Sequence, residues 1–262
     1  MDLELKGKVA IVTGGSEGIG RATAQAFGRE GASVVICARR PNVLETAARE
    51  IAAATGSEIV PVPTDVTRPE DVERAINAAV DRFGRLDILV NNAGISRGLP
   101  FDEATDAIWQ EDLDLKLFAA VRTCRLAIPH MQKAGGGSIV NILNTGARVP
   151  AAASVPTSVS RAAGLALTKA LSKEFAADRI RVNGVLIGYV KTSMHVRTWE
   201  AHGGDESLEE YYDRNAKQRG IPLGRVGEAI EVGDLIAFLC SARAAYITGT
   251  AIAFDGGSSP VI

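Results

Sequence analysis

The sequence predicts an α/β protein, with a single doubly wound, parallel β-sheet that carries helices on both faces. Two observations support this fold class. Short runs of β-branched and other apolar residues alternate with longer, alanine-rich stretches of helical character. A turn of closely spaced glycines follows the first apolar run, as in α/β folds that bind ligands beyond their strand ends. Repeated strand–helix–strand units with right-handed crossovers produce such a sheet.

Seven segments are predicted to be strands. Their near-continuous apolar character is typical of strands that are buried on both faces in a parallel sheet. In chain order, the predicted strands are 9–13, 33–37, 59–62, 86–91, 138–142, 180–186 and 251–254.

The segments between the strands are predicted to be helices, and Pro69 suits the first turn of one of them. We expect helices at 18–29, 41–54, 69–83, 105–133, 157–177 and 228–241. Because no repeat, low-complexity tract or linker is visible, we expect 1–262 to form one domain. The one long irregular stretch, about 193–226, is polar and glycine-containing and follows the sixth strand, which predicts a lid over a ligand crevice. A solvated surface insertion is the alternative.

Composition and charge exclude several classes of function. Lys and Arg total 29 against 31 Asp and Glu, a net charge of −2, so there is no global field for nucleic acid or anionic lipid. Cys37, Cys124 and Cys240 lack the spacing of a metal site and suit buried thiols in a reducing compartment. No apolar run approaches the ~20 residues of a membrane helix, and the N-terminus does not read as a signal peptide. We expect a soluble, cytoplasmic protein without a metal site.

The glycine-rich turn after the first predicted strand indicates a dinucleotide site. Glycines at 14, 18 and 20 let the backbone turn tightly and approach a pyrophosphate at the N-terminus of the next helix. A lone glycine-rich turn is weak evidence, but here a strand precedes it and a helix follows. The residues expected to contact the cofactor here are Gly14, Ser16, Glu17, Gly18, Ile19 and Gly20.

Two further segments fit the same site. Asp65 and Val66 follow the third strand, where a carboxylate can accept a hydrogen bond from an adenine amino group. The segment containing Asn91, Ala93 and Gly94 ends the fourth strand, where small residues let the backbone approach the ribose and nicotinamide. Taken singly, Asp65 could cap a helix and the asparagines could form a turn. Their joint occurrence favours the cofactor site.

These motifs resemble those of the short-chain dehydrogenase/reductases. The resemblance rests on Thr13–Gly20, Asn91–Gly94, and Thr248-Gly249 with Asp255-Gly256-Gly257 near the C-terminus, and it covers essentially the whole chain. It implies a seven-stranded Rossmann-like domain with strand order 3-2-1-4-5-6-7, assembled as a homotetramer or dimer. It also implies an oxidoreductase that acts on a carbonyl or secondary alcohol.

The end of the second strand distinguishes NAD from NADP. No acid stands there to hold a ribose 2′-hydroxyl, whereas Arg39 can pair with a 2′-phosphate. Glu17 occupies a place where many NADP-using relatives look to have a basic residue, which opposes NADP unless Glu17 turns toward Arg21 or Arg40. We expect NADP, with NAD as the alternative.

The resemblance also implies that the catalytic residues are replaced. The family's Ser, Tyr and Lys positions fall at Asn144, Thr157 and Arg161, and its helix Asn falls at Lys116. Asn144 can still donate a hydrogen bond to a substrate oxygen, and Arg161 can still hold ribose hydroxyls. Thr157 is a far weaker acid than a tyrosine phenol with its pKa of ~10. The alignment is anchored by Asn141, Ile142, Ser160, Ala162 and Ala163.

Lys116 is the candidate for the missing proton donor. If its amine lies beside Arg161, like charge and burial would lower its pKa toward neutrality. The alternative is a lysine that reaches solvent or the side chain of Asp112 or Asp114. None of the four tyrosines lies in the catalytic helix, and nothing in the sequence requires Tyr189 or the lid tyrosines to bend back.

The segment after the sixth strand resembles the part of the family that grips the nicotinamide end. Gly188, Val190 and Thr192 are the expected contacts, with Thr192 on the carboxamide. The apolar stretch 149–156, together with Met194 and Trp199, suggests a small hydrophobic substrate or simply a packed lid.

Three functions remain open from the sequence. An NADP(H)-dependent oxidoreductase with a rearranged active site is favoured slightly. A catalytically inactive, cofactor-binding pseudoenzyme that acts as a sensor or assembly subunit is the main alternative. A lyase or isomerase on the same fold is more remote, because fold alone does not fix function.

Overall fold

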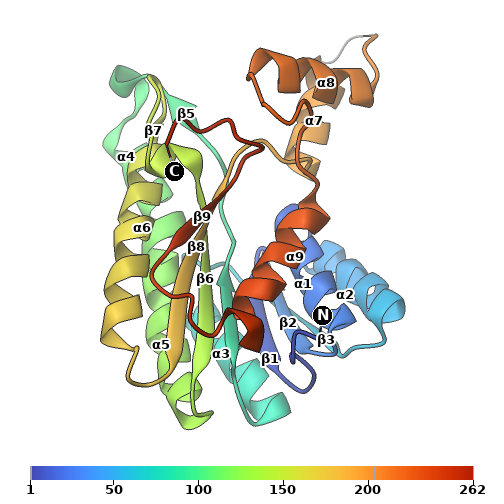
Figure 1. The fold of residues 1–262 in the computed structure, drawn as a ribbon, viewed down its shortest axis with the longest axis vertical. Coiled ribbons are helices and arrows are strands. Elements are labelled where there is room, and N and C mark those ends of the chain that lie inside the picture. Colours follow the sequence, from blue (N-terminus) through green and yellow to red (C-terminus); the bar gives the residue numbers. More distant parts are fainter. Residues whose placement is uncertain (1, 203–204, 262) are drawn as a thin grey trace.

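The computed structural model describes residues 2–202 and 205–261, which are built around a seven-stranded parallel sheet (Figure 1). The strand order is β3-β2-β1-β4-β6-β8-β9, so the predicted order of the seven strands is confirmed. The strands are β1 (Val9–Thr13), β2 (Ser33–Ala38), β3 (Ile59–Pro63), β4 (Ile88–Asn91), β6 (Gly137–Asn144), β8 (Ile180–Ile187) and β9 (Ala251–Phe254).

Helices cover both faces of this sheet, because every central strand presents apolar side chains on both sides. One face packs against α1 (Gly18–Arg29), α2 (Pro41–Thr55) and α9 (Ala229–Cys240). The other packs against α3 (Pro69–Phe83), α5 (Ala119–Lys133) and α6 (Thr157–Glu174). The sheet is therefore packed between two apolar layers, which fix the positions of the carboxyl ends of its strands.

The helix predicted over 105–133 is observed as an unbroken helical stretch from Asp106 to Lys133, but it contains a π-turn that the sequence did not predict. Its first part is α4 (Asp106–Leu113), followed by the π-helical turn η2 (Asp114–Phe118) and then α5. A π-turn adds one residue to a helical turn, and such turns often occur at functional sites. The sequence pattern missed it because a single extra residue barely alters the apolar periodicity. Lys116 lies within this turn and is buried.

The predicted lid is also more ordered than expected. The stretch 193–226, described except for residues 203–204, contains α7 (Ser193–His202) and α8 (Leu208–Gln218), which stand beyond the end of α9 in Figure 1. Ser207 and Glu210 form a reciprocal capping box that starts α8. Tyr211 and Tyr212 are buried in an apolar cluster with Trp199. This cap and this cluster make the segment helical despite its polarity.

Smaller elements complete the architecture. A two-stranded antiparallel sheet joins β5 (Gly98–Leu99) to β7 (Val155–Pro156), directly before α6. Short 3₁₀ turns occur at η1 (Phe101–Glu103), η3 (Thr145–Ala147) and η4 (Ala242–Ala244). Within the described part of the chain, no helix has the length and apolar character needed to cross a bilayer.

Candidate active site

A large cleft of about 1270 Å³ lies beyond the carboxyl ends of the strands. This volume exceeds the roughly 300–1,000 Å³ typical of a drug-sized ligand, so the cleft can hold two ligands together. Most residues predicted from the sequence line it: Gly14, Ser16, Glu17, Gly18, Ile19, Arg39, Asp65, Val66, Ala93, Gly94, Asn144, Thr157, Arg161, Gly188, Val190 and Thr192. Gly20, Asn91 and Lys116 do not line this cleft; Asn91 and Lys116 line a small adjoining cavity that shares Arg161 with it.

The glycine-rich turn is shaped by close backbone approach. Gly14 and Gly18 have positive φ values of 66° and 54°, a conformation that favours glycine. A Cβ on Gly20 would collide with the carbonyl oxygen of Gly14, so Gly20 lets α1 begin directly beneath the turn. A Cβ on Gly18 would lie 3.5 Å from the side chain of Thr192. The fold thus brings the first predicted cofactor segment against the last.

The charged residues beside this turn are arranged so that Arg39 is left for a ligand. Arg40 donates a 2.7 Å ion-paired hydrogen bond to Glu17, and Arg197 of α7 approaches the same oxygen at 3.4 Å. Glu17 therefore turns toward Arg40, the arrangement that the sequence required for a 2′-phosphate. Arg39 lines the cleft and forms no ion pair with any other residue between 2 and 261 that the structure describes.

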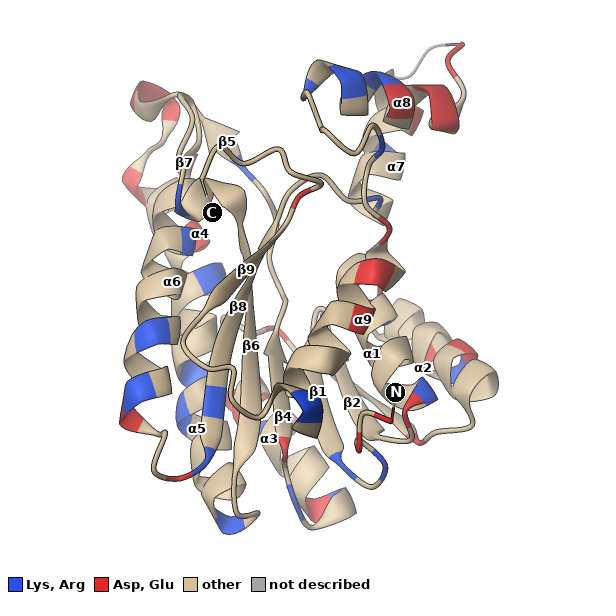
Figure 2. Ribbon diagram, in the orientation of Figure 1, with Lys and Arg blue, Asp and Glu red and all other residues tan. Residues whose placement is uncertain are grey.

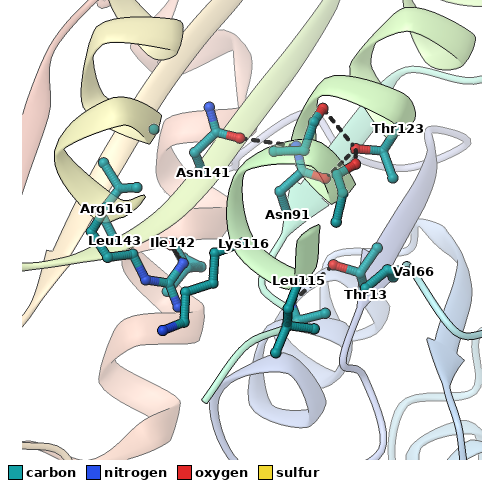
Figure 3. Close-up of a pocket in the computed structure, with 14 residues that line it drawn as sticks. Thr13, Val66, Asn91, Leu115, Lys116, Thr123, Asn141, Ile142, Leu143 and Arg161 are labelled. Carbon is teal, nitrogen blue, oxygen red and sulfur yellow. Dashed lines mark hydrogen bonds between the residues drawn. The ribbon is translucent and has the colours of Figure 1, made fainter. Parts of the chain in front are cut away.

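The side chains of Asp65 and Asn91 are partly used within the protein. Asp65 Oδ1 accepts hydrogen bonds from the backbone and hydroxyl of Thr67, at 3.0 and 2.7 Å, yet the residue still lines the cleft. Asn91 donates to Asn141 at 2.9 Å and accepts from Thr123 at 2.6 Å (Figure 3). Its buried amide therefore fastens β4 to β6 and α5.

Arg161 reaches the cleft wall from the first turns of α6. Its Nη1 donates a 2.6 Å hydrogen bond to the carbonyl oxygen of Ile142. A Cβ on Gly94 would lie 2.6 Å from its Nη2, so this glycine makes room for the guanidinium. Burial lowers the pKa of Arg161 to about 10, against the opposing pull of Asp112. Arg161 is thus a permanent positive charge at neutral pH.

Lys116 points inward from the π-turn toward Arg161 (Figure 3). Its side chain is 0% exposed. The amine donates to Asp112 Oδ2 and, at 2.7 Å, to Thr157 Oγ1. Burial lowers the Lys116 pKa to about 8, and Arg161 contributes, while Asp112 opposes the shift. The Lys116 side chain therefore lies beside Arg161 and also pairs with Asp112, so the geometry of both sequence alternatives occurs together.

Asp112 is a site residue that the sequence considered only as an alternative partner for Lys116. It is buried, and its Oδ1 accepts a 2.6 Å hydrogen bond from Ser160 of α6. Its other oxygen accepts from Lys116 and lies 3.3 Å from Thr157 Oγ1. The i,i+4 spacing of Asp112 and Lys116 was the available signal. The carboxylate therefore fixes both Lys116 and the start of α6.

Thr157 connects the buried amine to the cleft. Its hydroxyl accepts from Lys116 and, at 3.1 Å, from the backbone N–H of Arg97. It donates to the carbonyl oxygen of Arg97 at 2.7 Å. The β5–β7 pairing brings Arg97 to this point, a contact that the sequence did not reveal. Thr157 lines the cleft and Lys116 does not, so the Thr157 hydroxyl lies between the Lys116 amine and the cleft.

Asn144 stands at the end of β6, also on the cleft wall. Its Oδ1 is buried and has no hydrogen-bond partner among the residues that the structure describes. Buried polar atoms are rarely left unpaired. Because this atom is an acceptor, it is suited to a ligand group that donates a hydrogen bond, such as an alcohol hydroxyl.

Tyr189, Met194 and His195 also line the cleft. His195 Nδ1 donates to the carbonyl oxygen of Val190 at 2.8 Å, and burial lowers the His195 pKa. Tyr189 shares a 3.2 Å hydroxyl contact with Tyr211, and its pKa is raised by burial and by that contact, so it is a poor acid. Of the residues that suggested a hydrophobic ligand, Met194 lines the described cleft whereas Trp199 and 149–156 do not. Trp199 instead packs in an apolar cluster with Tyr211 and Tyr212.

The three cysteines are buried, and burial raises each thiol pKa to about 12. Within 2–202 and 205–261, no cluster of His, Cys, Asp and Glu is suited to hold a metal ion.

Comparison with known proteins places this cleft in context. Residues 14–259 match a family model described as enoyl-(acyl carrier protein) reductase. The chain is 35% identical over 258 residues to dehydrogenase/reductase SDR family member 4 of Oryctolagus cuniculus, covering 97% of this chain and 94% of that one.

Solved structures are similar over nearly the whole chain. L-sorbose reductase from Gluconobacter frateurii, complexed with NADPH and L-sorbose, is 36% identical with a TM-score of 0.95 and full coverage of both chains. An NADPH-bound short-chain oxidoreductase from Pseudomonas aeruginosa PAO1, described as containing an atypical catalytic center, is 36% identical with a TM-score of 0.92. That match covers 97% of this chain and 98% of the other.

Proposed function

The chain belongs to the short-chain dehydrogenase/reductase family, and from this premise we propose that it is an NADP(H)-dependent oxidoreductase whose proton donor is Lys116. The reaction interconverts a small carbonyl compound and its alcohol. The observation that carries the proposal is the buried Lys116 amine, 2.7 Å from the Thr157 hydroxyl on the cleft wall.

The replacement of the family's Ser, Tyr and Lys by Asn144, Thr157 and Arg161 is part of the proposal. Support comes from their common position: all three line one cleft beside the predicted nicotinamide segment. The Pseudomonas relative with its atypical center and bound NADPH gives a precedent for such an active site in the family.

NADP fits the residues of the cleft. Arg39 has no ion-pair partner among the described residues, and Glu17 is neutralised by Arg40, so a 2′-phosphate would meet a net positive surface. Gly14 and Gly18 would admit the pyrophosphate, and Gly188, Val190 and Thr192 would hold the nicotinamide end. The two solved relatives named above both contain NADPH.

When bound, the reduced cofactor supplies the hydride that adds to the carbonyl carbon. The chain supplies the proton for the carbonyl oxygen. Thr157 turns its hydroxyl hydrogen from the Arg97 carbonyl to the substrate oxygen and takes a proton from Lys116 Nζ. Asn144 donates a hydrogen bond to that oxygen and so orients the carbonyl. The neutral amine of Lys116 is then reprotonated from water.

The charges around Lys116 suit this role. Before reaction, the site contains the cations Lys116 and Arg161 and the anion Asp112. Loss of the Lys116 proton leaves one cation and one anion, so deprotonation removes an excess positive charge from a buried site. A pKa of about 8 is also close to working pH, where general acids are most effective.

Other features of the protein are proposals that follow from the family. We expect a cytoplasmic protein that assembles as a homotetramer or dimer, which light scattering at micromolar concentration would test. We also propose that the substrate is small and that Met194 and Leu143 of the cleft wall make apolar contacts with it.

The decisive test is a titration with NADPH and NADH, with and without a panel of small aldehydes and ketones. We expect tight NADPH binding and a loss of reduced-nicotinamide absorbance with at least one carbonyl compound. Binding of NADPH without turnover of any compound, in either direction, would refute the oxidoreductase and favour the pseudoenzyme.

A further inference from the structure

Arg219 is a cleft residue that the proposed reaction does not use. It follows α8 directly, at the end where the basic residues of that helix gather (Figure 2). Its guanidinium lies 4.3 Å from the ring centroid of Tyr189, which also lines the cleft. Arg219 is exposed, and among the described residues its side chain forms no salt bridge or hydrogen bond; its aromatic contact is the Tyr189 ring. A stacked guanidinium keeps its in-plane N–H donors available.

The other arginines of the cleft are accounted for. Arg40 and Arg197 share Glu17, and Arg161 is bonded to Ile142. Arg39 stands at the end of β2, where the 2′-phosphate is expected. Arg219 is therefore the cation that remains for the second ligand of the cleft.

Charge of the opposite sign is missing from that part of the wall. The acidic residues that line the described cleft are Glu17 and Asp65, and both belong to the cofactor segments. His195, beside Tyr189, has a lowered pKa and is neutral at pH 7. A cleft wall with one unpaired cation and no anion concentrates anionic ligands.

We propose that the substrate end of the cleft selects carbonyl compounds that carry an anionic group, a carboxylate or a phosphate, and that Arg219 binds this group. The inference rests on the proposed oxidoreductase function and names its substrate class. The hydroxyl of Tyr189, which already contacts Tyr211, gives the anion a second polar neighbour. The apolar residues of the wall then face the carbon chain between the anion and the carbonyl.

The test compares paired probes, one with the anionic group and one in which that group is esterified or absent. The carboxylate arm uses pyruvate, acetoacetate and levulinate against their methyl esters, and the phosphate arm uses dihydroxyacetone phosphate against dihydroxyacetone. Binding is measured by calorimetry with NADP⁺ present, and turnover is measured with NADPH. The variants are Arg219→Gln, Arg219→Lys and, as a charge-matched control, Lys217→Gln, an exposed residue of α8 outside the cleft wall.

We expect the wild type to favour at least one charged probe over its neutral partner by about tenfold or more. Arg219→Gln should remove most of this preference, Arg219→Lys should keep part of it, and Lys217→Gln should leave it unchanged. The arm that shows the preference identifies the anion as carboxylate or phosphate.

Two results would overturn the inference: no charge preference in either arm, or an Arg219→Gln variant that loses NADPH affinity in parallel, which would assign Arg219 to the cofactor. Failure of the proposed function looks different. Charge-dependent binding that Arg219→Gln abolishes, without turnover of any probe, would leave the anion site in place and remove the oxidoreductase.

Discussion

The proposed cofactor end of the cleft and its proposed reacting end are built in different ways. At the cofactor end, the shape of the site comes mainly from the tight backbone turn at Gly14, Gly18 and Gly20. Arg39 lines the cleft beside this turn. At the reacting end, buried side chains from several elements interlock: Lys116 from the π-turn, Asp112 from α4 and Thr157 from α6.

This difference shows where a family fold can change. A site formed by backbone tolerates few alternatives, because a Cβ on Gly20 would block the turn itself. In a site formed by side chains, the proton-donating residue can be replaced if another donor reaches the same position in the cleft. In the proposed reaction that donor is Lys116, which comes from the π-turn between α4 and α5 and not from α6.

Removing the Lys116 amine should give the largest loss. In Lys116→Met we expect hydride transfer to slow by about 10²–10⁴-fold, the usual contribution of a positioned acid, while NADPH still binds. Rapid-mixing measurement of NADPH oxidation gives the rate. Because Asp112 would be left buried and unpaired, the double variant Asp112→Asn, Lys116→Met keeps the test valid if the single variant unfolds. Lys173→Met, an exposed change on α6, is the control. An unchanged rate would exclude Lys116 as the donor.

Removing only the hydroxyl between the amine and the cleft should cost less. Thr157→Val has nearly the same volume, and we expect turnover to fall by about 10–100-fold because water can partly replace the relay. Thr157→Ser keeps the hydroxyl and should retain most of the activity. Equal activity of the Val and Ser variants, measured with the same substrate, would show that the proton takes another route.

The pH dependence of reduction should follow the ionisation of Lys116. The ammonium form is the acid, and its pKa is about 8, so kcat/KM for reduction should be level below that pH and fall about tenfold per unit above it. Oxidation of the alcohol, which needs the neutral amine, should show the opposite trend. A fall centred near pH 10 in both wild type and Lys116→Met would assign the profile to another group.

At the cofactor end, the expected effect is smaller and confined to one cofactor. Arg39→Gln should weaken NADPH binding by about tenfold and change NADH binding little, because only NADPH carries the 2′-phosphate. Fluorescence titration measures both. Arg40→Gln releases Glu17 and should weaken NADPH less than Arg39→Gln does. An equal loss for both cofactors would place the role of Arg39 away from the 2′-phosphate.

Much of the fold was predictable because its signals are local. Apolar runs and glycine turns placed α1 and α3 at their observed bounds, and all seven sheet strands near theirs. The π-turn was not predictable, since one added residue hardly changes the apolar period. The lid helices were missed although Ser207 and Glu210 spell a capping box, because the polarity of that stretch outweighed it.

For the site, the sequence could predict only those residues whose positions follow from the spacing of motifs along the chain. Motif spacing placed Asn144, Thr157 and Arg161 in one cleft and pointed to Lys116. It could not reveal that Ser160 bonds Asp112 or that Arg97 frames Thr157, because these contacts join segments about 50 or 60 residues apart. Arg219 was hidden for the same reason, within a segment expected to be irregular.

The π-turn at Asp114–Phe118 makes chain length, as well as residue identity, a condition for the proposed chemistry. Each residue advances an α-helix by about 100°. Deleting one residue between Lys116 and α5 would convert the turn to regular helix and rotate the lysine by nearly a third of a turn relative to Thr157. A homologue could therefore possess every side chain of this site and still lack the alignment of amine and hydroxyl, simply by being one residue shorter.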